Sequence, residues 1–281
     1  KTTGTRRTRP SEGVDLGICG TPPSEEASGA GGLRGASSTI RGRGAAENPP
    51  NRFEPMVLER DADWNPADDP APATQFFHDR SCSIISCNDS PDLGFDASVN
   101  PYRGCEHGCA YCYARPTHEY LGFSAGLDFE TRIMVKEDAP MLLRRELSSP
   151  KWRPRPLALS GVTDCYQPIE RRLKLTRRCL EVLAEFRNPV GVVTKNFLVT
   201  RDLDLLTELA RHQAVRVCLS LTTLDASLAA KLEPRAVLPE HRLADYMAGL
   251  MTRRISTALG FSHFSPRASA AFLSRSACRA M

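Results

Sequence analysis

The 281-residue sequence lacks any long hydrophobic run and any basic-then-apolar leader at its start. No stretch approaches the roughly 20 apolar residues that cross a bilayer. Without a leader, a reducing cytoplasm is the default location. We therefore expect a cytoplasmic protein with no membrane partner. The excess of positive charge is also small, a formal net charge of +4, and by itself it does not indicate a nucleic-acid-binding protein.

The ten cysteines lack the regular spacing of a disulfide framework, and three of them, Cys105, Cys109 and Cys112, are clustered. Clustered cysteines without a secretory leader indicate metal or redox chemistry. Gly104 and Gly108 let the backbone turn between these candidate ligands. Structural zinc sites and closed electron-transfer clusters take four ligands. Three cysteines would instead hold three irons of a 4Fe–4S cluster and leave the fourth iron open.

Composition divides the chain into four segments. Residues 1–50 are rich in Gly, Ser, Thr, Ala, Pro and Arg, too poor in apolar surface to offset their ordering entropy, and we expect disorder. Residues 51–96 are predicted to be a wrapping extension with one or two short strands, and Cys82 and Cys87 in it to be buried structural thiols. Residues 97–236 form the predicted core, and residues 237–281 an atypical tail, aberrant or disordered.

Strand and helix patterns alternate along the core. Apolar runs predict strands at 97–102, 129–135, 157–162, 190–194 and 215–221. Amphipathic spacing predicts helices at 139–147, 169–186 and 203–209, with Thr200 or Asp202 as the cap of the last. A further helix is predicted at 239–253 in the tail. Such alternation implies right-handed βαβ units and a parallel sheet.

Polar residues follow three of the predicted strands. In parallel sheets functional groups collect at the carboxyl ends of strands, and a strand buried on both faces has little other use for polar residues. The sequence therefore predicts a shared site at this edge of the sheet. Its candidate members are Thr163, Asp164, Thr194, Lys195, Ser220 and Thr222.

Basic residues are locally concentrated between residues 141 and 187, where 11 Lys/Arg stand against 5 Asp/Glu. Two interpretations are open: a solvated helix face, or a surface that binds phosphate groups.

Residues 100–113, Asn-Pro-Tyr-Arg-Gly-Cys-Glu-His-Gly-Cys-Ala-Tyr-Cys-Tyr, closely resemble the radical S-adenosylmethionine (radical SAM) signature Cys-x3-Cys-x-aromatic-Cys. The longer match, from about residue 41 to residue 235, looks like the DNA-repair photolyase-like branch related to spore photoproduct lyase. The resemblance implies an α/β fold, a partial TIM-type barrel of βα units. It also implies a 4Fe–4S cluster, S-adenosylmethionine, and an electron donor of the flavodoxin or ferredoxin type.

The resemblance further implies an enzyme, lyase- or repair-like, that reductively cleaves S-adenosylmethionine to a 5′-deoxyadenosyl radical. That radical abstracts hydrogen from a substrate which the sequence does not name, with nucleic acid among the candidates. The implied metal ligands are Cys105, Cys109 and Cys112. The implied cofactor-binding residues are Tyr111, Thr163, Asp164, Thr194, Lys195, Ser220 and Thr222. The implied catalytic residues are Tyr113 and Cys165, and the implied substrate-binding residues are Glu233 and Arg235.

The sequence departs from the lyase pattern in two places. Spore photoproduct lyase has a cysteine shortly before its Ser/Thr-Asp pair, whereas here Cys165 follows Thr163-Asp164, which argues against spore photoproduct repair itself. After Arg235 the expected fifth and sixth barrel strands are not evident. We therefore expect a barrel truncated after about four strands, with doubtful activity.

Two alternatives stay open. The first is a non-catalytic iron–sulfur or zinc module in which His107, His118 or Cys82 completes the ligand set. The second is an inactive, truncated radical SAM fragment. Neither the sequence nor the resemblance predicts the oligomeric state.

Overall fold

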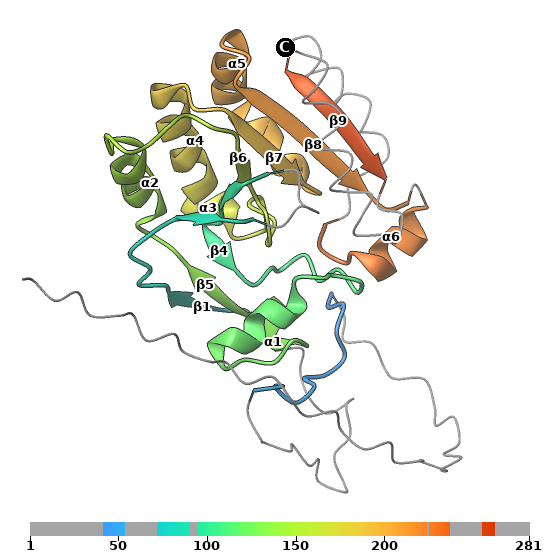
Figure 1. Cartoon of the computed structure of the whole chain (residues 1–281). Helices are drawn as coiled ribbons and strands as arrows, with labels where there is room; N and C mark the ends of the chain where they lie inside the picture. The colour runs from blue at the N-terminus through green and yellow to red at the C-terminus, as the bar shows by residue number, and fades with distance from the viewer. Residues whose placement is uncertain (1–41, 54–71, 90–94, 224, 237–254, 262–281) are drawn as a thin grey trace, which may run out of the picture. The chain divides into compact units, whose positions relative to one another are not determined.

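The computed structural model describes residues 42–53, 72–89, 95–223, 225–236 and 255–261. Two sheets form within these ranges, and Figure 1 shows the strands of the larger one side by side. None of the helices in these ranges has the length and apolar character needed to cross a membrane.

The larger sheet has the strand order β2-β3-β6-β7-β8-β9. Its strands are β2 (Ile85–Cys87), β3 (Ala97–Val99), β6 (Leu157–Leu159), β7 (Val190–Thr194), β8 (Val215–Leu221) and β9 (Ser256–Phe261). From β3 to β9 every neighbouring pair is parallel, while β2 pairs with β3 in the antiparallel sense. The predicted parallel sheet is therefore confirmed.

The register of this sheet places a row of apolar residues across one of its faces. Val99, Leu159, Val192 and Val217 lie opposite one another on consecutive strands, and all four are buried in the main core. Helices α2 (Ala139–Leu147), α4 (Leu175–Phe186) and α5 (Leu203–Arg211) supply the rest of this core. Because side chains alternate along a strand, the neighbouring positions point to the other face and are free to serve a site.

The smaller sheet has the order β1-β5-β4 and carries the start of the cysteine motif. Its strands are β1 (Gln75–His78), β4 (Tyr102–Arg103) and β5 (Arg132–Val135). The predicted strand 97–102 is thus split between the two sheets. Pro101 stands at the break, and proline has no N–H to donate to a ladder.

Three other predicted elements differ from the structure. The run 129–135 begins as the helical turn α1 (Asp128–Thr131) and becomes β5 only at Arg132. The strand predicted at 157–162 ends at Leu159, where Ser160 takes a positive φ of 82°. The helix predicted at 169–186 is two helices, α3 (Glu170–Leu173) and α4, because Lys174 between them adopts a left-handed conformation.

The tail contributes a strand that the sequence pattern did not indicate. β9 pairs in parallel with all but the first residue of β8, from Arg216↔Ser256 to Leu221↔Phe261. The described sheet therefore has five parallel strands instead of the four expected, and β9 covers the β8 edge that the prediction left open. The helix predicted at 239–253 lies outside the described residues.

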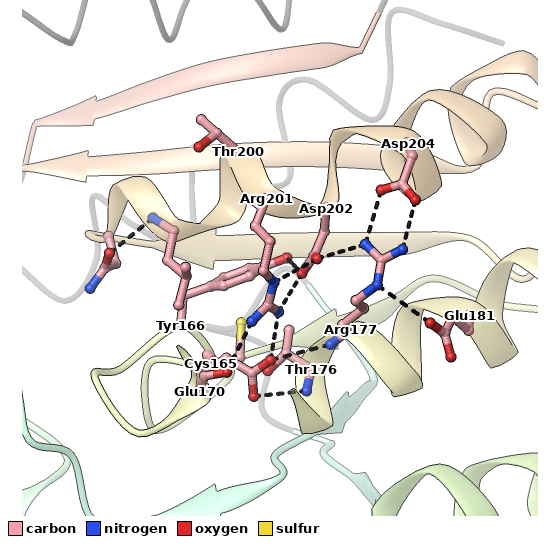
Figure 2. Close-up of polar contacts among 12 residues, drawn as sticks. Cys165, Tyr166, Glu170, Thr176, Arg177, Glu181, Thr200, Arg201, Asp202 and Asp204 are labelled. Carbon is pink, nitrogen blue, oxygen red and sulfur yellow. Dashed lines mark hydrogen bonds and ion pairs between the residues drawn. The ribbon is translucent and has the colours of Figure 1, made fainter. Parts of the chain in front are cut away.

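A buried charged network joins α3 and α4 to the segment before α5, and Figure 2 shows its contacts among Glu170, Arg177, Arg201 and Asp202. We call it the helix network; its members are Tyr102, Tyr166, Glu170, Thr176, Arg177, Arg201 and Asp202. The two carboxylates are fully buried. Arg201 bridges them, donating to Glu170 Oε1 and Asp202 Oδ2, each at 2.7 Å. Asp202, predicted as a helix cap, makes no capping bond and serves this network instead.

Candidate functional site

The cysteine motif forms a loop (residues 104–113, the cysteine loop) held by main-chain bonds. Cys105 N donates to Phe129 O at 2.9 Å, and Cys112 N donates to Cys109 O at 3.2 Å. Gly104 and Gly108 have φ values of 83° and 68°. A Cβ at Gly104 would lie 2.9 Å from Phe129 O. The backbone therefore requires glycine there, both for its conformation and for its close approach.

The three thiols of this loop are largely buried and interact with one another in pairs. Burial raises the pKa of Cys105, raises that of Cys109 to about 12, and raises that of Cys112. Cys109 and Cys105 interact electrostatically, as do Cys112 and Cys109. Among the described residues, however, no three His, Cys, Asp or Glu side chains are grouped as ligands around one point. The three cysteines lie on one loop, but their sulfur atoms do not point to a common centre in the described structure.

A segment that was expected to be disordered packs on the cysteine loop. Within residues 1–50, the described part, 42–50, makes specific contacts. The Glu130 carboxylate accepts from Gly44 N and Ala45 N at 3.1 and 2.9 Å, and Arg43 donates to Glu130 O at 3.0 Å. A Cβ at Gly44 would lie 1.8 Å from Gly108 O. These contacts with the cysteine loop and Glu130 hold residues 42–50 in place. Amino-acid composition alone does not reveal such contacts.

Asp164 is the acceptor at the centre of the predicted strand-end site. It accepts from Thr194 Oγ1 and Lys195 N, each at 2.8 Å, and from Tyr166 N. His107 Nδ1 lies 3.4 Å from Asp164 Oδ2. Burial alone would raise the pKa of Asp164, but His107 and these hydrogen bonds hold it below its usual value. Asp164 therefore ties the cysteine loop to the end of β7.

A second cluster surrounds Lys195, and we call it the cradle: Tyr111, Lys195, Ser220, Thr222 and Glu233. Lys195 Nζ donates to Ser220 Oγ at 2.8 Å and lies 2.9 Å from Glu233 Oε1. Tyr111 and Thr222 also donate to Glu233 Oε1. Burial would lower the pKa of Lys195, but Glu233, Tyr111 and Cys109 raise it above its usual value. The cradle thus holds a stable buried cation beside the cysteine loop.

The end of α6 (Ala226–Leu232) and the residues that follow it bind the cysteine loop, and we call residues 232–235 the clasp. Ala110 N donates to Leu232 O at 2.9 Å, and Arg235 N donates to His107 O at 3.2 Å. Arg235 also pairs with Glu106 Oε1 at 3.0 Å. Glu233 and Arg235, which the resemblance implies as substrate-binding residues, are therefore bound to the signature motif itself.

Three other predicted residues lie outside the cradle. Thr163 Oγ1 donates to Tyr102 O at 2.9 Å and is buried behind the loop. Cys165 is fully buried in the main core, and burial raises its pKa well above the usual value. Tyr113 is 74% exposed, and its hydroxyl donates to Gly161 O at 2.9 Å.

The residues considered as a fourth metal ligand are engaged elsewhere. His107 Nε2 lies 3.1 Å from Asn196 Nδ2, and His118 Nε2 lies 2.9 Å from Arg132 O between two phenylalanine rings. Cys82 is exposed, and so is Cys87. The expectation that these two thiols are buried is wrong, because every residue of β1 and most of β2 faces solvent.

Several residues that hold the site were not predicted. Gln167 Oε1 accepts from Glu106 N at 2.9 Å, and Arg115 donates to Cys109 O at 2.8 Å and to Glu130. Glu106 lies inside the signature, and that position is the signal that could have identified it. Gln167 pairs with Glu106 across a separation of 61 residues, which no local pattern in the sequence reveals.

No family model matches this chain. It is 42% identical over 170 residues to "Uncharacterized protein Rv2578c" of Mycobacterium tuberculosis, covering 60% of this chain and 50% of that protein. It is 30% identical over 145 residues to "Uncharacterized protein MJ0683" of Methanocaldococcus jannaschii, covering 52% and 51%. The chain thus spans about half the length of the curated relatives it matches.

Among solved structures, the chain is similar to spore photoproduct lyase complexed with dinucleoside spore photoproduct. The TM-score is 0.48 at 16% identity, covering 66% of this chain and 50% of that one. A mutant of the same lyase with bound AdoMet and dinucleoside spore photoproduct gives a TM-score of 0.45 at 18% identity, covering 70% and 54%. Because this likeness is weak, the description of the fold depends on the strand order of the chain itself.

Proposed function

We propose that this protein is a radical SAM enzyme that binds a 4Fe–4S cluster and S-adenosylmethionine. The observation that carries the proposal is the position of the signature cysteine loop. The loop lies at the carboxyl ends of the parallel strands, tied to β7 through His107 and Asp164 and to the cradle through Tyr111. A metal site with a purely structural role has no use for a buried cluster of polar and charged side chains such as the cradle beside it.

The donor set of this loop fits such a cluster. Cys105, Cys109 and Cys112 would hold it, the two glycines give the backbone its turns, and the positive charge of Lys195 favours the thiolate of Cys109. Because burial raises the pKa of all three thiols, loading releases their protons. The sulfurs must draw together when they bind, since they are not converged in the described structure.

The reduced cluster would supply one electron that cleaves S-adenosylmethionine to methionine and a 5′-deoxyadenosyl radical, which takes a hydrogen atom from the substrate. The chain's own residues bind and orient. Lys195 and Ser220 suit the carboxylate of the cofactor, since a buried ammonium and a hydroxyl both donate. Clasp and loop together shield the reacting centre from water. The polar residues that do not reach the cradle, Thr163 and Cys165, take no part in this proposal.

Further parts of this proposal rest on the sequence alone. Nucleic acid as substrate, a flavodoxin or ferredoxin as electron donor, and a cytoplasmic location all stay predictions. Because the chain spans half of its relatives, the activity of the whole protein is also part of the proposal.

The test is anaerobic reconstitution. We expect about four irons per chain, as a 4Fe–4S cluster requires, and 5′-deoxyadenosine on reduction in the presence of S-adenosylmethionine. Cys105→Ser should lose both, whereas Cys179→Ser, a buried core thiol outside the loop, should keep both. Tight binding of one zinc without 5′-deoxyadenosine would instead support the zinc-module alternative. Cluster binding without 5′-deoxyadenosine would support the inactive fragment.

A further inference from the structure

Two buried carboxylates lie near the cysteine loop, and they differ in how their charge is balanced. Among the described residues, no Lys or Arg side chain pairs with Asp164, whereas Glu233 pairs with Lys195 at 2.9 Å. The ion-pair partner of Asp164 in this part of the chain is His107, whose Nδ1 lies 3.4 Å from Oδ2. The charge of His107 therefore decides whether the negative charge of Asp164 is compensated.

The hydrogen bonds around His107 make it a neutral imidazole. Asn196 Oδ1 accepts from Leu198 N at 2.9 Å, which leaves the Asn196 amide nitrogen, a donor, 3.1 Å from His107 Nε2. Nε2 must then accept, so it carries no proton, and the single ring proton lies on Nδ1. A neutral imidazole holds the carboxylate of Asp164 in place but does not cancel its charge.

Donors of the chain surround both oxygens of Asp164. Oδ1 accepts from Thr194 Oγ1 and Tyr166 N, and Oδ2 accepts from Lys195 N, each at 2.8 Å. With His107 Nδ1 facing Oδ2, these donors occupy the roughly four lone-pair sites of a carboxylate. A protonated carboxyl would set its O–H against one of them, so the arrangement requires the ionised form. It also leaves this carboxylate, which the resemblance implies as cofactor-binding, no lone pair for a cofactor.

The uncompensated charge of Asp164 lies next to a candidate cluster ligand. The main-chain N–H groups of His107 and Asp164 hydrogen-bond to the sulfur of Cys105, and, after burial, the charge of Asp164 is the next cause that raises the pKa of this thiol. The side chain of Asp164 is only 10% exposed, so solvent screens the interaction weakly. The charge therefore acts on whatever Cys105 binds.

We infer that Asp164 sets the reduction potential of the cluster held by Cys105, Cys109 and Cys112. Reduction adds one electron to the cluster, and a buried negative charge beside one of its ligands disfavours that addition. Iron–sulfur potentials respond to net charge and to hydrogen bonds around the sulfurs. Asp164 thus makes the reduced cluster a stronger reductant. This inference rests on the proposed function and assigns Asp164 to the cluster instead of the cofactor.

The test is a redox titration of the reconstituted protein without S-adenosylmethionine. The EPR signal of the reduced cluster, followed with mediators as dithionite is added, gives the midpoint potential. In Asp164→Asn we expect this potential to rise by about 59 mV, which is a tenfold change in the equilibrium constant for one electron.

Two further variants separate charge from shape. Asp164→Glu keeps the charge although it lengthens the side chain, and its midpoint potential should stay close to that of wild type. The matched control is Glu185→Gln, at an exposed glutamate paired with Arg144, which should not change the potential.

If Asp164→Asn does not fold or does not bind iron, Thr194→Val serves in its place. This substitution removes one neutral donor to Oδ1 and leaves the charge of Asp164. The less solvated carboxylate acts more strongly on the cluster, so the midpoint potential should fall. A potential that stays the same or rises in Thr194→Val would overturn the inference.

The outcomes distinguish the inference from the proposed function. An unchanged potential in Asp164→Asn, or an equal rise in Asp164→Glu, would overturn the role of Asp164 and leave the proposed function standing. A wild-type protein that binds no iron–sulfur cluster would overturn both.

Discussion

The cradle and the helix network are two buried charged clusters of similar composition, and they differ in how their donors are distributed over the carboxylate oxygens. In the helix network, Glu170 Oε1 and Oε2 accept from Arg201 and Tyr102, and both oxygens of Asp202 accept as well. In the cradle, three donors converge on Oε1 of Glu233. Each carboxylate oxygen of the helix network has donors of its own, so the loss of one donor is felt, whereas the three donors of the cradle share one acceptor and can compensate for one another.

The largest expected effect comes from breaking the helix network. Arg201→Ala leaves two fully buried carboxylates without their shared cation, and should lower the free energy of unfolding by about 3–5 kcal/mol. Arg211→Ala, which removes an exposed arginine paired with Glu208, should cost less than about 0.5 kcal/mol. Urea denaturation of both variants measures this. Similar losses for the two arginines would show that the network carries no special stability.

A matched pair of tyrosine substitutions compares the two clusters directly. Tyr102→Phe removes a fully buried hydroxyl that donates to Glu170 Oε2 at 2.6 Å, and should cost about 1.5–3 kcal/mol of stability. Tyr111→Phe should cost less than about 1 kcal/mol, because Lys195 and Thr222 still donate to the same oxygen of Glu233. Urea midpoints test the difference, and equal losses would contradict the contrast between acceptors with donors of their own and one acceptor shared by three donors.

The smallest effect is expected at the exposed edge of the helix network, where Arg177 binds Asp204 (Figure 2). The hydrogen bond from Arg177 lowers the pKa of Asp204 below its usual value. The pair therefore stabilises the fold above the unfolded pKa of about 3.9, and this stability is lost as pH falls through the folded pKa. Asp204→Asn should cost about 0.2–1 kcal/mol at pH 7.

Urea midpoints of wild type and Asp204→Asn, followed from pH 7 to pH 3, should converge towards the acid end. A difference that persists unchanged at pH 3 would mean that the charge of Asp204 is not its source.

Regular periodicity was a reliable guide to parts of this fold. The strand at 190–194 and the strand at 215–221 have the bounds that their apolar runs predict, as does the helix at 139–147. Positions where a single residue adopts an unusual conformation were not predictable. Lys174 breaks a continuous amphipathic pattern through a left-handed conformation, which lysine does not favour by itself.

For the site, the sequence by itself determined the three cysteines and most of the polar strand ends, because the cysteine spacing and the residues after each strand are local features. Tertiary structure decided which of them meet. It buried Cys165 in the core, turned Thr163 to the back of the loop, and added β9 to the sheet. It also brought Glu233 onto Lys195, because a buried charge is stable only where the fold supplies its partner.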